Sequence, residues 1–220
     1  MTTPPALEAS GAPVWGHRAE LRAAADRPKG DCSDFARRGP DGIAGGDNRL
    51  VNPTIRIPAP EEAEAVTRML CELDRENSTM MLEPGERSED PRLLQEWLSV
   101  LHPDHHCYLV VFDGLRALGF VHAERGPFRR SRHSAYVVIG LLEEARGSGW
   151  GRRLLEAVDR WATERGVARL ELTVMTHNAA AIGLYRRCGY VEEGLRRHSL
   201  ILDGTPVDEF AMAKLLTPDR

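Results

Sequence analysis

Apolar residues spaced three or four positions apart mark the buried faces of two predicted helices. In residues 60–76 they are Ala63, Val66, Met69, Leu70 and Leu73, and after residue 151 they are Leu154, Leu155, Val158, Trp161 and Ala162. Pro60 and the acidic residues that follow it favour a helix start at that point. Two shorter helices are predicted at residues 91–101 and 178–188.

Two pairs of strands are predicted to form hairpins. Residues 106–124 predict two apolar strands with a turn at Asp113-Gly114, and residues 196–216 predict a second pair with a turn at Asp203-Gly204. Asp-Gly between two apolar runs is the strongest short signal for a hairpin, because glycine accepts the backbone angles of a tight turn.

Three further strands complete the pattern. Residues 54–58 alternate between apolar and polar side chains, and residues 168–175 form a short strand before the last helix. Residues 133–142 are apolar almost throughout, which predicts a strand buried on both faces. The order of elements therefore predicts a mixed α/β (α+β) fold, with antiparallel hairpins around a buried centre.

Residues 1–52 differ from the rest of the chain. They are rich in Gly, Pro, Asp and Arg and show no apolar period. Such a segment cannot bury enough apolar surface to offset the entropy lost on ordering, so we expect a disordered or loosely attached extension. The folded domain is expected to span residues 53–217.

Composition narrows the classes of function. The formal net charge is −4, which argues against general nucleic-acid binding. No apolar run is long enough to span a membrane, and the first residues lack the features of a secretory signal, so we expect a cytoplasmic protein. The four cysteines form no Cys-x-x-Cys pair, and the cluster of His102, His105 and His106 lacks partner ligands, so no metal is expected.

Charge is distributed unevenly along the chain. Residues 61–104 contain 12 acidic and 4 basic residues, which predicts that this part of the chain attracts a cation. Glu83 and Glu86 lie between the first two predicted helices, where they could receive a cationic amine. A solvated acidic loop is the alternative interpretation of both residues.

The segment RGSGWG, residues 146–151, lies directly before a predicted helix. Its glycines allow backbone N–H groups to face a ligand, and the helix start adds unpaired N–H groups and the positive end of the helix dipole. Arg146 carries a planar guanidinium that suits phosphate oxygens, so the segment predicts an anion site. A flexible strand-to-helix loop would contain the same glycines.

Three motifs, in order, resemble the GNAT N-acetyltransferase superfamily. RGSGWG matches its R/Q-x-x-G-x-G/A signature, NAAAIGLYRRCGYVEEG resembles its second marker, and LDGTPVDEFAMAKL resembles the closing hairpin of its ribosomal-protein, polyamine and amino-acid acetyltransferase branches. The resemblance covers residues 54–216. It implies a GNAT-like fold, with a mostly antiparallel central sheet flanked by helices, and acetyl transfer from acetyl-CoA to a primary amine of a small molecule or protein.

The resemblance also implies roles for individual residues. The central strand at Ile139, Gly140 and Leu141 would pair with the pantetheine arm of acetyl-CoA, Asn178 would bond the cofactor, and Tyr185 would protonate the leaving thiolate. The phosphates would lie against Arg146, Gly147, Ser148, Gly149, Trp150, Gly151 and Arg152. Trp150 is interpreted mainly as a packing residue.

The attacking amine must first lose a proton, so a base or a water chain is required. His122 and Glu124 alternate with Phe120 and therefore share one face of a strand. Glu143 is a third candidate, and Glu124 is our choice of catalytic base. A solvated or structural polar residue is the alternative interpretation for each of them.

Two other functions stay open at this point. A non-catalytic acyl-CoA-binding regulatory module would share the cofactor motifs, and a protein that binds ATP or NAD would share the glycine loop. No Gly-Lys-Ser/Thr follows the loop, and hairpins rather than repeated βαβ units surround it, which disfavours the nucleotide-binding reading. A homodimer is compatible with the sequence.

Overall fold

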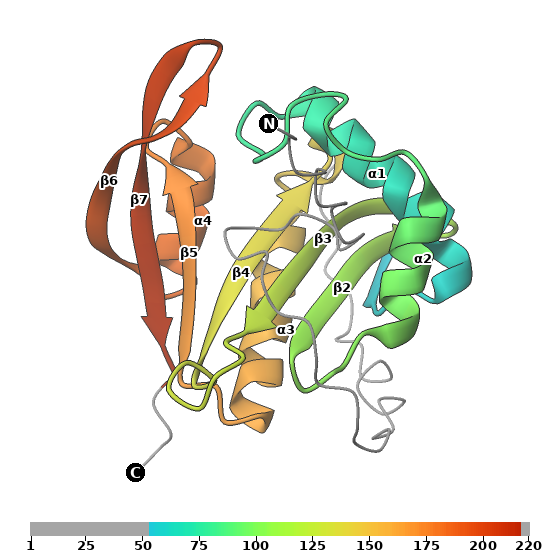
Figure 1. Ribbon diagram of the computed structural model, residues 1–220, viewed down its shortest axis with the longest axis horizontal. Coiled ribbons are helices and arrows are strands. Elements are labelled where there is room, and N and C mark those ends of the chain that lie inside the picture. Colours follow the sequence, from blue (N-terminus) through green and yellow to red (C-terminus); the bar gives the residue numbers. More distant parts are fainter. Residues whose placement is uncertain (1–52, 217–220) are drawn as a thin grey trace, which may run out of the picture.

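Figure 1 shows the computed structural model, which describes residues 53–216. The expected N-terminal extension and residue 217 lie outside the described residues. The strands are β1 (Pro53–Arg56), β2 (His106–Asp113), β3 (Arg116–Arg125), β4 (Ser134–Leu141), β5 (Arg169–Met175), β6 (Val191–Leu202) and β7 (Thr205–Leu215). The α-helices are α1 (Ala63–Glu76), α2 (Pro91–Val100), α3 (Trp150–Glu164) and α4 (Ala179–Arg187), and short 3-10 helices cover Pro60–Glu62 and Glu143–Ala145.

The strands form one sheet in the order β1-β2-β3-β4-β5-β7-β6. Every neighbouring pair is antiparallel except β4 and β5, which confirms the predicted mixed and mostly antiparallel sheet. The parallel pair is short, because only Ser134–Tyr136 of β4 pairs with Arg169–Glu171 of β5. Beyond this point the two strands diverge (Figure 1).

Helices cover both faces of the sheet. α1 and α2 pack on the face of β2 and β3 that is in front in Figure 1, and α3 packs behind the sheet. The apolar stripes predicted for α1 and α3 are buried throughout, which confirms both helices. Within residues 53–216, no helix is long and apolar enough to cross a membrane.

The two hairpins turn at nearly the predicted positions. Asp203 and Gly204 both have positive φ angles, of 49° and 75°, as the predicted turn requires. In the first hairpin Asp113 still pairs with Arg116, so the turn consists of Gly114 and the residue after it. The predicted turn was therefore one residue too early.

The prediction that β4 is buried on both faces was wrong. Tyr136, Val138, Ile139 and Leu141 are only half-buried. An apolar run normally indicates burial between two neighbouring strands and two layers of helices. Here the divergence of β5 removes one neighbour and leaves these side chains around an open space.

Gly119 allows β3 to approach β4 closely beside this opening. A Cβ at position 119 would lie 2.6 Å from the carbonyl oxygen of Gly140 and would also meet Leu141. We therefore expect Gly119→Ala to lower the free energy of unfolding by about 1–3 kcal/mol, as overpacking does, in a urea titration. Gly194→Ala is the matched control, because nothing lies within 4 Å of its Cβ position, and equal effects of the two substitutions would contradict this account.

Candidate active site

A cleft of about 680 Å³ opens where β4 and β5 diverge. Its walls come from the loop after α1, from β4, from the glycine loop and first turn of α3, from the end of β5 and from α4. Leu200 of β6 and Glu209 of β7 complete the lining. The volume lies in the range of small-molecule sites, so the cleft is the candidate active site.

The edge of β4 that faces the cleft presents backbone hydrogen-bonding groups. The carbonyl of Leu141 accepts a hydrogen bond from Arg146 Nε at 3.0 Å, whereas the N–H of Leu142 bonds to the carbonyl of Leu118 on the β3 side. Successive residues of a strand direct their backbone N–H and carbonyl groups to opposite sides. The backbone groups of Ile139 therefore point to the same side as those of Leu141. Such an edge can pair with an extended ligand as another strand would.

The start of α3 presents unpaired backbone N–H groups next to the glycine loop. Gly149 is the N-cap residue and has a φ of 84°, and no side chain caps the helix. The first hydrogen bond of the helix runs from the N–H of Arg153 to the carbonyl of Gly149 at 3.2 Å. The N–H groups of Trp150, Gly151 and Arg152 therefore have no partner within the helix and are available to an anion.

The three glycines of the loop serve different purposes. A Cβ at Gly147 or Gly149 would meet nothing within 4 Å, but both residues have positive φ angles. A Cβ at Gly151 would lie 2.8 Å from Leu184 Cδ2 on α4. Gly147 and Gly149 therefore set the loop conformation and leave the space beside the loop open to a ligand. Gly151 allows α3 to pack closely on α4.

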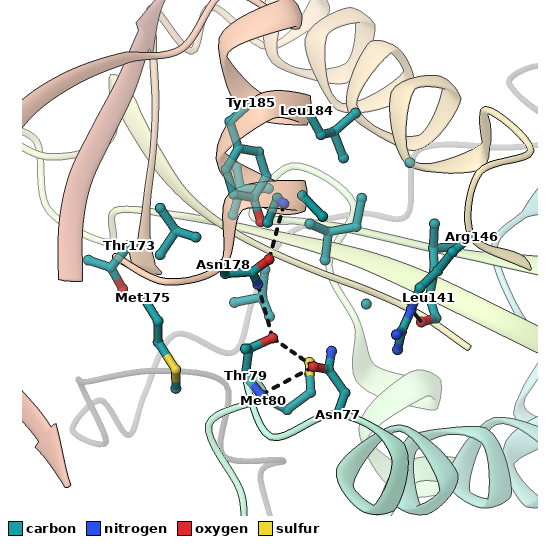
Figure 2. Close-up of a pocket in the computed structure, with 18 of the residues that line it drawn as sticks. Asn77, Thr79, Met80, Leu141, Arg146, Thr173, Met175, Asn178, Leu184 and Tyr185 are labelled. Atoms are coloured by element: carbon teal, nitrogen blue, oxygen red, sulfur yellow. Dashed lines mark hydrogen bonds between the residues drawn. The ribbon is translucent and has the colours of Figure 1, made fainter. Parts of the chain in front are cut away.

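Asn178 links α4 to the loop that follows α1, as Figure 2 shows. Its Oδ1 accepts a hydrogen bond from the N–H of Ala181 at 3.1 Å, and its Nδ2 donates to Thr79 Oγ1 at 3.0 Å. Thr79 in turn donates to Asn77 Oδ1 at 2.7 Å. The second N–H of the Asn178 amide takes part in none of these bonds, so it is available to a ligand.

Tyr185 enters the cleft from α4. Only 7% of the residue is exposed, and burial raises the pKa of its hydroxyl well above the usual value, so it keeps its proton at neutral and moderately alkaline pH. A second tyrosine, Tyr136 of β4, lies within the same cleft. Its hydroxyl bonds Thr173 Oγ1 of β5 at 2.8 Å, and this bridge joins the two strands where their backbones separate.

A buried ion pair shapes the wall formed by the loop after α1. Arg87 Nε donates to Asp74 Oδ2 at 2.5 Å, and Arg87 Nη2 donates to Oδ1 at 3.0 Å. The two side chains are 10% and 2% exposed. A bidentate contact fixes the loop to α1, and the loop then presents Met80, Met81 and Leu82 to the cleft.

Most of the predicted cofactor residues come together in this cleft with Tyr185, the predicted general acid. Those that line it are Ile139, Gly140, Leu141, Arg146, Gly147, Gly149, Trp150, Gly151, Arg152, Asn178 and Tyr185. Ser148 is exposed in the same loop without lining the cleft. Trp150 is also buried in the core, as expected of a packing residue.

The acidic candidates lie elsewhere. Glu124 is exposed and stands opposite Tyr136 in the register of β3 and β4, and desolvation raises the pKa of its carboxyl. Glu83 and Glu86 are exposed, and Glu86 Oε2 accepts a hydrogen bond from the N–H of Glu83 at 2.8 Å within their own loop. None of the three lines the cleft, so their catalytic and acceptor roles stay predictions.

His122, the other strand candidate, is buried 3.2 Å from His106 (Nε2 to Nδ1), beside Trp97. Burial lowers the pKa of His122 to about 3, and the residue does not line the cleft. It shares a strand face with Glu124, as predicted, because both alternate with Phe120 on β3. Its place is within an aromatic cluster under α2.

Several lining residues were missed from the sequence, among them Tyr136, Thr173, Arg187 and Glu209. Tyr136 stands in an apolar run that indicated only a core strand. Thr173 alternates with buried leucine and valine on β5, which gave no sign that it faces a cleft. Glu209 offered one signal, because it follows Asp208 and the two acids stand directly before apolar residues in a predicted strand.

The profile of the acetyltransferase (GNAT) family matches residues 67–190, which is more than half of the chain. The mycothiol acetyltransferase of Jonesia denitrificans is 34% identical over 108 residues, which cover 49% of this chain and 32% of that protein. The L-amino acid N-acetyltransferase AaaT of Escherichia coli is 29% identical over 141 residues, which cover 57% of this chain and 85% of that protein. The chain thus spans about a third of the first relative and most of the second.

A solved structure shares the fold. YncA of Salmonella typhimurium, described as a putative acetyltransferase with its cofactor acetyl-CoA, superposes with a TM-score of 0.68 over 77% of this chain and 96% of that protein, at 19% identity. At this identity the likeness concerns the fold alone.

Proposed function

The chain belongs to the acetyltransferase (GNAT) family, and on that basis we propose that it transfers the acetyl group of acetyl-CoA to a primary amine. The observation that carries the proposal is the juxtaposition of the open edge of β4 with the start of α3. The first suits an extended arm that carries amide groups, and the second suits phosphates. Acetyl-CoA combines both features in one molecule.

The described residues fit acetyl-CoA along the length of the cleft. Ile139 and Leu141 would pair with the amides of the pantetheine arm, and the free N–H of Asn178 would add a further bond. The N–H groups at the start of α3 would hold the pyrophosphate, with Arg146 and Arg152 as nearby positive charges. Arg187 at the end of α4 also lines the cleft and would add a further positive charge.

The directions of two pKa shifts support the proposed catalytic roles. Tyr185 keeps its proton because burial raises its pKa, so it would supply a proton to the departing thiolate. Backbone N–H groups of β4 would stabilise the charge that develops on the carbonyl oxygen. Glu124 remains our candidate for the base, acting through water, because it stands beside Tyr136 and has a raised pKa.

The acceptor would enter at the other end of the cleft, between the loop after α1 and the end of β5. A non-catalytic acyl-CoA-binding module would need the cofactor end alone. Beyond the cofactor end, the cleft continues and is lined by Thr173, Met175, Leu200 and Glu209. This additional space supports the binding of a second substrate. Turnover of acetyl-CoA with a panel of primary amines would separate the two functions, since a binding module would consume none.

The cellular setting is inferred from the cysteines. Cys71, Cys107 and Cys188 are free thiols, which is typical of proteins in a reducing compartment, so the protein is proposed to act in the cytoplasm. Small-molecule or peptide amines are the proposed partners.

Gly149→Val should weaken acetyl-CoA binding at least tenfold by calorimetry, because its side chain would stand where the phosphates approach. Gly166→Val is the matched control, since Gly166 also has a positive φ, 63°, and open space at its Cβ position, but does not line the cleft. Arg146→Ala should have a smaller effect, because the backbone donors remain. Equal affinity of Gly149→Val and wild type would remove the phosphate site from this loop.

Tyr185→Phe keeps the ring and deletes the proton donor. We expect turnover to fall roughly 10²- to 10⁴-fold, with the acetyl-CoA dissociation constant nearly unchanged. Because burial raises the pKa of Tyr185, its ionisation should not depress the wild-type rate between about pH 7 and pH 10. Tyr190→Phe serves as the control, since Tyr190 packs on Tyr185 at 5.8 Å between ring centroids and does not line the cleft. Near-normal turnover of Tyr185→Phe would assign this residue to packing.

A further inference from the structure

Glu209 is a carboxylate at the acceptor end of the cleft. It lies on β7 opposite Met175 of β5, and only 4% of the residue is exposed. Its Oε2 accepts a hydrogen bond from Arg196 Nη1 at 3.1 Å, whereas Oε1 has no hydrogen-bond partner among residues 53–216. Oε1 itself is not fully buried, so it reaches the surface of the cleft and is able to accept a hydrogen bond from a ligand there.

The face of the sheet that carries Glu209 has more acids than bases. Glu124 and Glu171 both stand opposite Tyr136 in the register, so the three side chains share one face, and by alternation along β5 and β7 Glu209 shares it too. Arg169 pairs with Glu171 on this face. Neither Glu124 nor Glu171 lines the cleft, and among the described residues Glu209 is its one acidic lining residue. Of the lining arginines, Arg87 is paired with Asp74, and Arg146 and Arg152 belong to the glycine loop and the start of α3, so Glu209 is the group at this end that attracts a cation.

Arg87, which is paired with Asp74, and the hydrogen-bonded pair Tyr136 and Thr173 also line the cleft, and apolar side chains line much of this end. They are Met80, Met81 and Leu82 of the loop after α1, Met175 of β5 and Leu200 of β6. Figure 2 shows Met80 and Met175 on the far side of Asn178 from Tyr185. Methionine side chains are flexible and polarisable, so they adapt to unbranched apolar groups of different lengths.

We propose that this end of the cleft selects primary amines that carry an unbranched apolar tail, an inference that rests on the proposed acetyl transfer. An alkylamine is protonated at neutral pH. Its ammonium group donates a hydrogen bond to Glu209 Oε1, and its tail packs against the methionine side chains. A tail that ends in a carboxylate is disfavoured, because the methionine side chains offer the buried charge no hydrogen bond.

The wild-type protein tests the substrate class directly. n-Hexylamine, 6-aminohexan-1-ol and 6-aminohexanoate present the same amine on a six-carbon chain that ends in a methyl, a hydroxyl or a carboxylate group. We expect kcat/KM to be highest for n-hexylamine and at least tenfold lower for 6-aminohexanoate. Equal values, or a preference for 6-aminohexanoate, would overturn the inference.

Variants test the role of Glu209. Glu209→Gln should raise the KM for n-hexylamine roughly 10- to 100-fold and leave the acetyl-CoA dissociation constant unchanged, whereas Glu209→Asp, which keeps the charge, should recover part of the loss. Glu192→Gln is the matched control, because it removes the same charge from an exposed position outside the cleft. If Glu209→Gln and Glu192→Gln have equal effects, Glu209 is not the amine site.

Failure of the inference can be distinguished from failure of the proposed function. Binding of n-hexylamine to the protein in the presence of CoA is measured by calorimetry and needs no turnover. If it binds and Glu209→Gln abolishes binding, the inference holds even where no acetyl transfer occurs. If acetyl transfer to other amines occurs but n-hexylamine does not bind, the proposed function stands and the inference falls.

Discussion

The candidate site depends on the point at which backbone pairing between β4 and β5 ends, after three residue pairs. Backbone N–H and carbonyl groups are strong hydrogen-bonding groups that need partners, and a strand in the middle of a sheet normally finds them on both sides. Beyond Tyr136, β4 pairs on the β3 side alone. The open edge is therefore a template for a ligand with amide groups, placed inside the protein rather than at its rim.

The surrounding contacts hold this opening in place from several directions. The bond between Tyr136 and Thr173 closes the narrow end, and the bond between Asn178 and Thr79 connects the α4 wall to the loop wall. The Arg87 ion pair anchors that loop to α1. All three contacts are made by side chains, and the Tyr136–Thr173 bond spans β4 and β5 where their backbone ladder ends. The site is therefore preorganised by polar side-chain contacts, two of which join elements that are distant in the sequence.

The sequence predicted the elements well and the open cleft poorly. The apolar stripes of α1 and α3 were correct because helical periodicity records which face is buried. The apolar run of β4 indicated burial on both faces, yet a cleft lined by apolar side chains has the same composition as a core. The glycine loop and Tyr185 were found through motifs, whereas Thr173 and Glu209 face the cleft only because β5 and β7 follow a particular register. Register between distant strands is a property of the assembled sheet, which local patterns do not record.

The central claim is that acetyl-CoA lies along the open edge of β4 and against the start of α3. Amide hydrogen exchange with and without acetyl-CoA tests this most directly, because it reports hydrogen bonding of individual backbone segments. The account predicts that acetyl-CoA slows exchange in residues 137–141 and 147–152, with little change in α2 or in the β1–β2 pair. Saturating acetyl-CoA that leaves both segments unprotected, or that protects a different surface, would contradict it.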